Sequence, residues 1–337
     1  MKRHFCLIFF CCSTLMLAQD FTNQWTGYFS YLDIRDLSVG NNKVYAAAQN
    51  ALFEYDPLSE TTRTTDAING LDGSEISALY YSENFGLSMV GFENGLLQVI
   101  MDNNGQVFTI VDILNKQTIS PDAKRINHFY EFEDKLFIST EFGIAEYNLA
   151  NLEFGDSFFI GNNGQQLDIT ETTIIGNTIF ASTIGGGIRF ADVNDPNLVD
   201  FESWSGFGTP NWRGVLNFNS QLLGIQFGNR LMSIENNIPT LVRQFDETII
   251  QLENYEGFLV VVTKSSVHVF NDSLTEIGFV NSLFDGENSF DTNFSSAVIV
   301  DEILYVGDTE LGLLKMEDFN SSSFTAVGPD GPILNSV

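Results

Sequence analysis

The segment LSMVGFENGLLQVI (87–100) consists of an apolar strand, a tight turn at Asn94-Gly95 and a second apolar strand. Such pairs of strands recur every forty-odd residues, and no apolar pattern of helical length lies between them. This repeat is typical of β-propeller blades. The sequence therefore predicts an all-β fold, a seven-bladed β-propeller of four-stranded antiparallel blades. The pattern occurs seven times, in copies that begin at Val44, Leu87, Leu136, Ile179, Leu222, Leu259 and Leu304, which are 43, 49, 43, 43, 37 and 45 residues apart.

Each repeat divides into four strands, which in the first blade are Ile34–Val39, Val44–Ala48, Ala51–Tyr55 and Thr61–Thr65. The second and third strands of most blades are nearly continuous apolar runs, as expected for sheets covered on both faces. Glycine recurs just before the third strand, at Gly95, Gly143, Gly187 and Gly312, where it permits a turn of positive φ. The other inner strands are expected at Ile76–Tyr80, Ile126–Tyr130, Ile169–Ile174, Gly214–Phe218, Ile249–Leu252 and Ser296–Val300.

The two ends of the chain differ from the repeats. Residues 1–19 combine the basic Lys2-Arg3 with a short apolar core and a small-residue cleavage context, so they are predicted to be a secretory signal peptide. Residues 20–328 are assigned to the propeller, and the proline- and glycine-rich 329–337 to a connector or a truncated end. Nothing after the signal reaches the roughly 18 consecutive apolar residues that a membrane span needs.

Ring closure is expected to involve the N-terminal segment. Trp25–Tyr31 (WTGYFSY) precedes the first repeat and is too aromatic for a free tail. We expect it to pair with the last blade around Ile303–Val327, because this would remove an exposed sheet edge.

Composition limits the possible partners and compartments. The 44 acidic residues outnumber the 15 basic ones, giving a net charge of −29, so long-range attraction to nucleic acid or anionic lipid is not expected. All three cysteines (Cys6, Cys11 and Cys12) lie in the predicted signal, which leaves the mature chain without disulfides or cysteine metal ligands. The chain is predicted to be exported, to the periplasm or the outer-membrane surface.

The sequence gives little support for catalysis, a cofactor or a metal. The mature chain has two histidines, His128 and His268, and neither has a second histidine or a cysteine at ligand spacing. No nucleophile elbow, phosphate-binding glycine loop or complete calcium loop is present. Adjacent carboxylates are expected by chance among so many, so a glycosidase pair can be judged only in three dimensions.

Four scarce cations precede or begin predicted inner strands, where they would converge on one mouth of the channel. Guanidinium groups bind phosphate or carboxylate, and an indole ring can stack on a sugar. The candidate site for an anion or an acidic glycan is therefore Arg35, Lys124, Arg125, Trp212 and Arg213. The alternative is local ion pairing, with Asp33, Asp36, Asp122 or Glu171 as the partners.

Residues 68–100 resemble the two-component regulator propeller repeat, in their Asn69-Gly70-Leu71 turn, the strand Ile76–Tyr81 and the Asn94-Gly95-Leu96 turn. Together with the predicted signal, the opening 25–56 and the end 328–337, they make the chain similar to the N-terminal propellers of the PorZ family, which serves the type IX secretion machinery of Bacteroidetes. That family continues into a second propeller and a sorting domain, and this sequence ends before either.

The resemblance implies a non-enzymatic surface protein of the secretion attachment complex. Its implied partners are a sortase-like protease, other outer-membrane secretion components and anionic lipopolysaccharide. Two alternatives remain open. A sensor ectodomain of a two-component regulator shares the repeat, and a propeller hydrolase or lyase acting on glycans would need carboxylates, His or Tyr converging at the channel.

Overall fold

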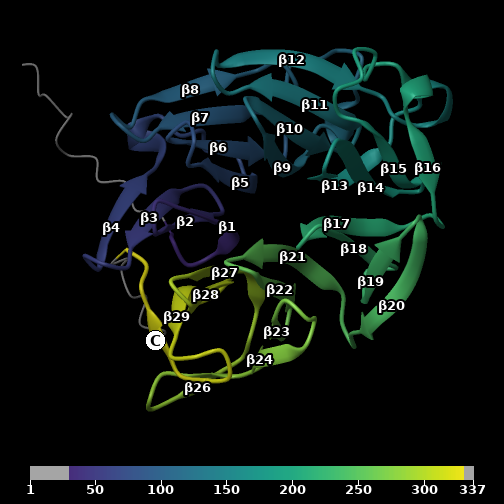
Figure 1. The fold of residues 1–337 in the computed structure, drawn as a ribbon. Helices are drawn as coiled ribbons and strands as arrows, with labels where there is room; N and C mark the ends of the chain where they lie inside the picture. The colour runs from purple at the N-terminus through teal and green to yellow at the C-terminus, as the bar shows by residue number, and fades with distance from the viewer. Residues whose placement is uncertain (1–29, 330–337) are drawn as a thin grey trace, which may run out of the picture.

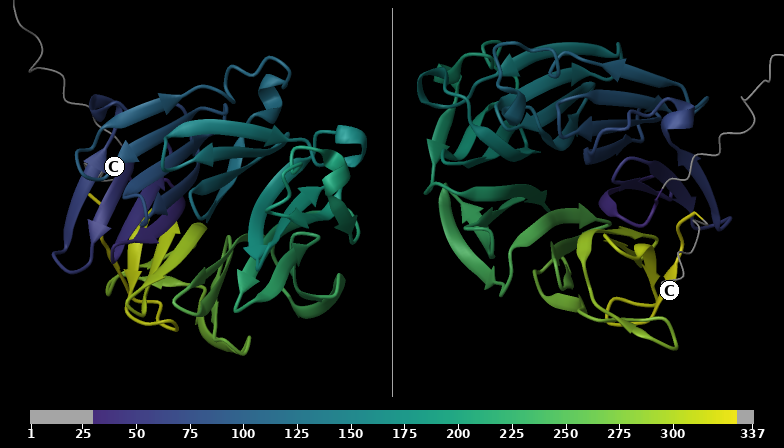
Figure 2. Two further views of the ribbon diagram at one scale, coloured as in Figure 1. Left: turned by 45° about the horizontal axis from the view of Figure 1, so that its top comes forward. Right: turned by 180° about the vertical axis from the view of Figure 1, so that it is seen from behind.

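Residues 30–329, which are the part of the chain that the computed structural model describes, form seven four-stranded antiparallel sheets around a central axis (Figure 1). In every sheet the strands follow one another in sequence order from the axis outward. The prediction of a seven-bladed propeller is confirmed. Views from two further directions show the sheets stacked side by side around the ring (Figure 2).

The first four blades span a little more than half of the chain. Their strands are β1 (Ile34–Gly40), β2 (Lys43–Ala48), β3 (Leu52–Asp56) and β4 (Thr61–Thr65) in blade 1; β5 (Ile76–Ser82), β6 (Leu87–Phe92), β7 (Leu97–Met101) and β8 (Val107–Ile110) in blade 2; β9 (Ile126–Phe132), β10 (Lys135–Thr140), β11 (Gly143–Asn148) and β12 (Glu153–Phe158) in blade 3; and β13 (Asp168–Ile175), β14 (Thr178–Ile184), β15 (Gly187–Asp192) and β16 (Ser205–Phe207) in blade 4.

The last three blades complete the ring. Their strands are β17 (Trp212–Phe218), β18 (Gln221–Gln226), β19 (Arg230–Glu235) and β20 (Ile238–Gln244) in blade 5; β21 (Ile249–Tyr255), β22 (Phe258–Thr263), β23 (Val267–Phe270) and β24 (Glu276–Val280) in blade 6; and β27 (Phe294–Val300), β28 (Ile303–Asp308), β29 (Gly312–Met316) and β30 (Phe324–Ala326) in blade 7. A small hairpin, β25 (Leu283–Phe284) and β26 (Ser289–Phe290), precedes blade 7, and four short 3₁₀ helices lie in loops: η1 (Ala67–Asn69), η2 (Pro121–Ala123), η3 (Asn162–Gly164) and η4 (Phe201–Ser203).

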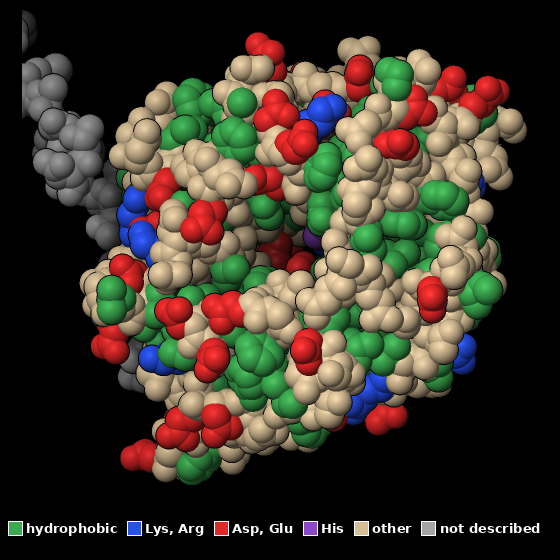
Figure 3. Space-filling view, viewed as in Figure 1, with side chains coloured by type: hydrophobic (Ala, Val, Ile, Leu, Met, Phe, Trp, Pro, Cys, Tyr) green, Lys and Arg blue, Asp and Glu red, His purple; other side chains and the backbone are tan. Residues whose placement is uncertain are grey.

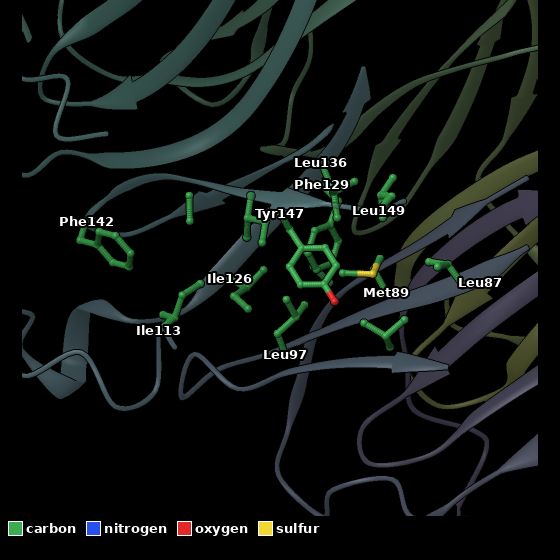
Figure 4. Packing of buried hydrophobic residues seen from close by; sticks show 14 of the residues in the cluster. Leu87, Met89, Leu97, Ile113, Ile126, Phe129, Leu136, Phe142, Tyr147 and Leu149 are labelled. Carbon is green, nitrogen blue, oxygen red and sulfur yellow. The ribbon is translucent and has the colours of Figure 1, made fainter. Parts of the chain in front are cut away.

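The core lies between neighbouring blades. Between blades 2 and 3, for example, Met89 and Leu97 of one sheet pack against Leu136 and Tyr147 of the next, and all four side chains are at most 1% exposed (Figure 4). The second and third strands are largely buried along their length because both faces of each sheet are covered. This explains the continuous apolar runs seen in the sequence.

The glycines before the third strands behave as predicted. Gly95, Gly187 and Gly312 have φ values of 85°, 78° and 86°, a region that glycine enters without strain. At Gly143, where φ is 156°, the reason is space, because a side-chain carbon would collide with the Phe158 carbonyl oxygen.

The ring closes by direct packing of blade 7 on blade 1. Ile34 lies against Gly307, where an added methyl carbon would be only 2.6 Å from Ile34 Cγ2. Ile126 and Gly91 make the same contact between blades 2 and 3, with a corresponding distance of 2.5 Å. The seam is therefore an ordinary interface between blades.

The expected closing strand lies mostly outside the described residues. Of Trp25–Tyr31, the structure describes only Ser30 and Tyr31, and neither is in a strand. Tyr31 lies at the seam, where its ring contacts Phe53 edge-on and its carbonyl is close to Gly312. All four described strands of blade 7 come from Phe294–Ala326. The predicted signal peptide also lies outside the described residues, and the predicted division of the chain stays a prediction.

The tight seam yields a stability test. Gly307→Ala is expected to lower the free energy of unfolding by about 1–3 kcal/mol, the usual cost of overpacking a filled interior. Urea denaturation measures the loss. Gly73→Ala is the control, because an added carbon at Gly73 meets nothing within 4 Å. Equal stability of the two variants would contradict the close seam.

Candidate functional site

One irregularity is repeated in all seven inner strands and shapes one end of the channel. Each inner strand has a β-bulge near its start, where its pairing with the second strand shifts by one residue. A bulge turns one extra side chain out of the regular alternation. We call this end of the channel the entry mouth and the residue just before each bulge the anchor. The bulge residues are Arg35, Ser77, Asn127, Thr170, Arg213, Ile250 and Ser295.

The channel is an open cavity of about 830 Å³. Asp, Glu and His side chains are visible deep in the central hollow (Figure 3). Arg35 and Arg125 line this cavity, whereas Lys124, Trp212 and Arg213 are not among its lining residues. The structure thus brings two of the five predicted site residues together in the channel wall.

The two lining arginines already have acidic partners. Arg35 Nη2 contacts Asp33 at 2.9 Å and Glu75 at 3.0 Å, and Arg125 Nε is 3.5 Å from Glu93. Of the partners considered from the sequence, Asp33 is found. Glu75 and Glu93 could not be foreseen, because they come from the neighbouring blade. Both arginine side chains remain substantially exposed, at 35% and 43%.

Trp212 cannot serve as a stacking surface for a sugar. It is fully buried at 0% exposure, in a cluster with Ile188 and Val215. Trp212 is the anchor of blade 5, and the anchors of the other blades are all large apolar residues: Ile34, Ile76, Ile126, Ile169, Ile249 and Phe294. Aligning the seven repeats by their anchors therefore indicates from the sequence that the Trp212 ring belongs to the core.

Lys124 is also removed from the mouth. It is 6% exposed, and its Nζ donates a hydrogen bond to the Leu114 carbonyl oxygen at 2.5 Å. Arg213 is exposed, and its aliphatic part lies against Gly228. The structure therefore leaves three of the predicted residues, Arg35, Arg125 and Arg213, accessible at or beside the mouth.

Below the bulges the channel wall carries ionisable groups that the sequence analysis did not single out. Asp36, His128 and Glu171 occupy the position after the bulge in their blades, and Glu253 faces the same cavity. His128 Nε2 is 3.8 Å from Glu253 Oε1. These groups are 43 to 217 residues apart in sequence, so only the closed ring brings them together.

Their pKa values are displaced by the shared environment. Burial raises the pKa of Asp36 to about 7, against the opposing hydrogen bond from the Leu79 amide. Burial also raises the pKa of Glu171 to about 8, although nearby His128 acts in the opposite direction. Burial lowers the pKa of His128, but the contact with Glu253 and the charge of Glu171 outweigh it, so the net shift is upward.

A glycan-cleaving enzyme would need carboxyl groups that converge on the channel. Asp36 and Glu171 do lie in the channel wall, but they are engaged in hydrogen bonds between blades. Asp36 accepts the Leu79 amide of the next blade at 2.7 Å, and Glu171 accepts the Val215 amide at 3.0 Å. At the same position of blade 6, Gln251 accepts the Ala297 amide at 2.7 Å. Since an uncharged amide forms the same link, we assign Asp36 and Glu171 to ties between blades.

The second histidine is part of a polar chain between blades 5 and 6 that is buried at His268 and Ser266 and reaches the surface at Glu276. His268 Nδ1 is 2.6 Å from Glu276 Oε1, and Glu276 Oε2 is 2.7 Å from Arg243 of blade 5. His268 Nε2 is 2.9 Å from Ser266 Oγ. The order is that of a hydrolase triad, but Ser266 is only 8% exposed and its Oγ also bonds Thr263 Oγ1 at 2.8 Å. This series of hydrogen bonds is thus a polar link between the two blades, and its serine is not accessible to a substrate.

Two further observations concern only residues 30–329. Within this range no three His, Cys, Asp or Glu side chains are grouped so that they could hold a metal ion. The helices of the same range are too short to span a membrane.

Comparison with known proteins identifies the propeller type. Residues 44–205, from blade 1 into blade 4, match the family model described as TSS9, PorZ, N-terminal beta-propeller domain. The chain is a PorZ-like propeller. No curated protein sequence is significantly similar to it.

Solved structures share the fold. PorZ of Porphyromonas gingivalis, described as an essential bacterial surface component of the type-IX secretion system, superposes with a TM-score of 0.72 at 14% identity, covering 92% of this chain and 40% of its own. The extracellular domain of a protein named as a hybrid two-component system of B. thetaiotaomicron gives 0.64 at 12% identity, covering 85% and 40%. The designed protein Ika8 gives 0.55 at 11% identity, covering 85% and 96%. This PorZ-like chain therefore spans about 40% of the length of the PorZ structure.

The raised pKa of Glu171 gives a test of the tie. Its carboxyl binds a proton in the folded state up to about pH 8 but, with an ordinary pKa of 4.5, releases it earlier when unfolded. Stability should therefore fall as pH rises from 5 to 8. Glu171→Gln should remove the part of this loss that Glu171 causes, while the part that Asp36 causes remains, and should stabilise the protein at pH 8 by about 1 kcal/mol, because the carboxyl keeps some exposure to the channel.

Thermal unfolding at pH 5 and pH 8 measures the effect. Gln251→Glu is the matched control, since it introduces a carboxyl at the same position of blade 6 and should make stability more dependent on pH. Wild type and Glu171→Gln with parallel pH profiles would show that the carboxyl is not protonated in the fold.

Proposed function

We propose that this chain is a non-enzymatic binding and scaffold component of the type IX secretion attachment complex. The observation that carries the proposal is the match of blades 1–4 to the PorZ N-terminal propeller model. Of the two natural solved structures, PorZ superposes better than the sensor ectodomain and covers more of the chain. The comparison therefore favours the secretion role over the sensor role.

The proposed ligand of the mouth is anionic lipopolysaccharide. Arg35 and Arg125 line a cavity whose volume of about 830 Å³ lies within the usual range of ligand sites. Each guanidinium has five N–H donors, and the ion pairs of Arg35 use only Nη2 while that of Arg125 uses Nε. The remaining donors are free to bind phosphate or carboxylate groups of a glycan, with Arg213 beside the mouth as a third cation.

The proposed setting is the outer-membrane surface or the periplasm, with a sortase-like protease and other secretion components as partners. Two features support a role in presenting ligand rather than cleaving it. Two channel carboxyls, Asp36 and Glu171, are engaged with backbone amides, and the Ser266 hydroxyl next to His268 is buried. A rigid ring with a polar mouth suits a protein that binds lipopolysaccharide and presents it to a sortase-like protease.

A pull-down with lipopolysaccharide tests the ligand. Wild-type protein should be retained on beads carrying lipopolysaccharide with an anionic polysaccharide, and less on beads whose polysaccharide is neutral. The triple variant Arg35→Ala, Arg125→Ala and Arg213→Ala should lose at least ten-fold in retention, because the cations of the mouth are removed together.

The control is Lys43→Ala with Lys135→Ala, which removes two cations paired on the blades themselves, with Glu54 and Glu146. It should keep wild-type retention. Unchanged retention of the triple variant, or equal retention on neutral and anionic beads, would remove the lipopolysaccharide proposal.

A further inference from the structure

A second surface lies beside the mouth and shares Arg213 with the proposed lipopolysaccharide site, while its Ile250 lines the edge of the same cavity. It consists of Arg213, Phe227, Arg230 and Ile250, which we call the blade-5 patch. Phe227 is 51% exposed and Ile250 is 46% exposed. Arg230 lies over the Phe227 ring at 5.4 Å from its centre. The patch thus combines two exposed apolar side chains with two guanidinium groups.

The two arginines of the patch stand out by their lack of partners. Seven arginines lie within residues 30–329, and the side chains of five make a hydrogen bond or an ion pair there. Arg213 and Arg230 make neither with any described residue, in a chain that carries 44 carboxylates. Their charge is left available to a partner.

Comparison of two blades explains why Arg213 is unpaired. Arg35 is the bulge residue of blade 1, and its partners Asp33 and Glu75 precede the anchors of blades 1 and 2. Arg213 is the bulge residue of blade 5, and Asn211 and Thr248 stand at the two corresponding positions. Glu247, next to Thr248, instead accepts the Ser265 amide at 3.0 Å.

Phe227 places a bulky ring in the turn between β18 and β19, where the backbone has positive φ as it does at Glu256 in the turn between β21 and β22. Its φ is +55°, a region in which a bulky side chain is strained. Leu152 and Leu274 also have positive φ, but both pack against core clusters, whereas Phe227 belongs to none. Strained, exposed aromatic residues often mark contact sites.

The loop that carries Phe227 is fixed on both sides. The Phe227 amide donates to the Asn211 carbonyl at 3.0 Å, and the Gly228 carbonyl accepts the Ile249 amide at 2.7 Å. The second bond joins the loop directly to the residue before Ile250. The turn that carries Phe227 is therefore fixed against the start of the strand that carries Ile250.

We infer that the blade-5 patch docks a protein segment carrying one or two carboxylates beside an apolar side chain. The guanidinium groups would bind the carboxylates, and Phe227 with Ile250 would cover the apolar side chain. An aliphatic residue such as Ile250 favours a protein segment over a sugar, which prefers flat aromatic faces. The partner has few carboxylates because a strongly acidic one would be repelled by the net charge of −29.

The probe is a fluorescein-labelled hexapeptide in which two aspartates alternate with phenylalanine and leucine, compared with its asparagine counterpart by fluorescence anisotropy. Wild type should bind the acidic peptide at least ten-fold more tightly. Phe227→Gly should lose at least ten-fold in affinity while its unfolding temperature stays equal or rises, because glycine tolerates the positive φ.

The sharpest variant is Thr248→Glu, which gives Arg213 the acidic neighbour that Arg35 has in blade 1. It should lose at least ten-fold in affinity although no residue of the patch is removed. Arg63→Ala is the matched control, since that arginine lies outside the mouth and the patch and is paired with Glu54 and Asp102, and it should change affinity less than two-fold.

The inference is overturned if wild type does not prefer the acidic peptide, or if Thr248→Glu or Phe227→Gly binds it as wild type does. It is also overturned if the peptide fails to bind while polygalacturonate binds in a manner that depends on Phe227, because the patch would then be a sugar site. Failure of the lipopolysaccharide pull-down leaves these results unaffected, since the peptide measurement uses no lipopolysaccharide.

Discussion

Packing between the faces of neighbouring blades is the interaction on which the rest of the structure depends. Each inner strand inserts its anchor toward the preceding blade, as Ile126 does against Gly91 and Ile34 against Gly307. This apolar contact joins the sheets into a ring, with support from the hydrogen bonds that Asp36, Glu171 and Gln251 accept from the next blade. Every feature of the channel follows from the ring being closed.

The repeated bulge then converts a structural repeat into a varied surface. Because the bulge falls at the same position in every inner strand, five of the seven bulge residues line the channel cavity and Arg213 lies beside it. These side chains differ in chemistry: Arg35 and Arg213 are cationic, Asn127 is polar and Ile250 is apolar. Function in such a fold resides in what each blade places at this position, while the anchors stay large and apolar.

The fold could be predicted from the sequence because the periodic signal is local. Inner strands such as Ile34–Gly40 and Ile126–Phe132 begin where the apolar pattern placed them. The site was less accessible to the same reasoning. Trp212 is predicted to bind ligand from its indole ring and its place beside Arg213, although its alignment with six apolar anchors indicates burial. The partners Glu75 and Glu93 lie on adjacent blades, and Glu171 and Glu253 meet only across the channel, so their contacts depend on ring geometry that a linear pattern does not contain.

Hydrogen exchange at the seam between blades 7 and 1 tests the central claim, closure of the ring, most directly. Backbone amides of β1 and β27 should exchange as slowly as those of the interior inner strands β9 and β13, because all four are covered by neighbouring blades. Exchange in β1 and β27 that is faster by orders of magnitude, with β9 and β13 still protected, would show an open ring and contradict the account.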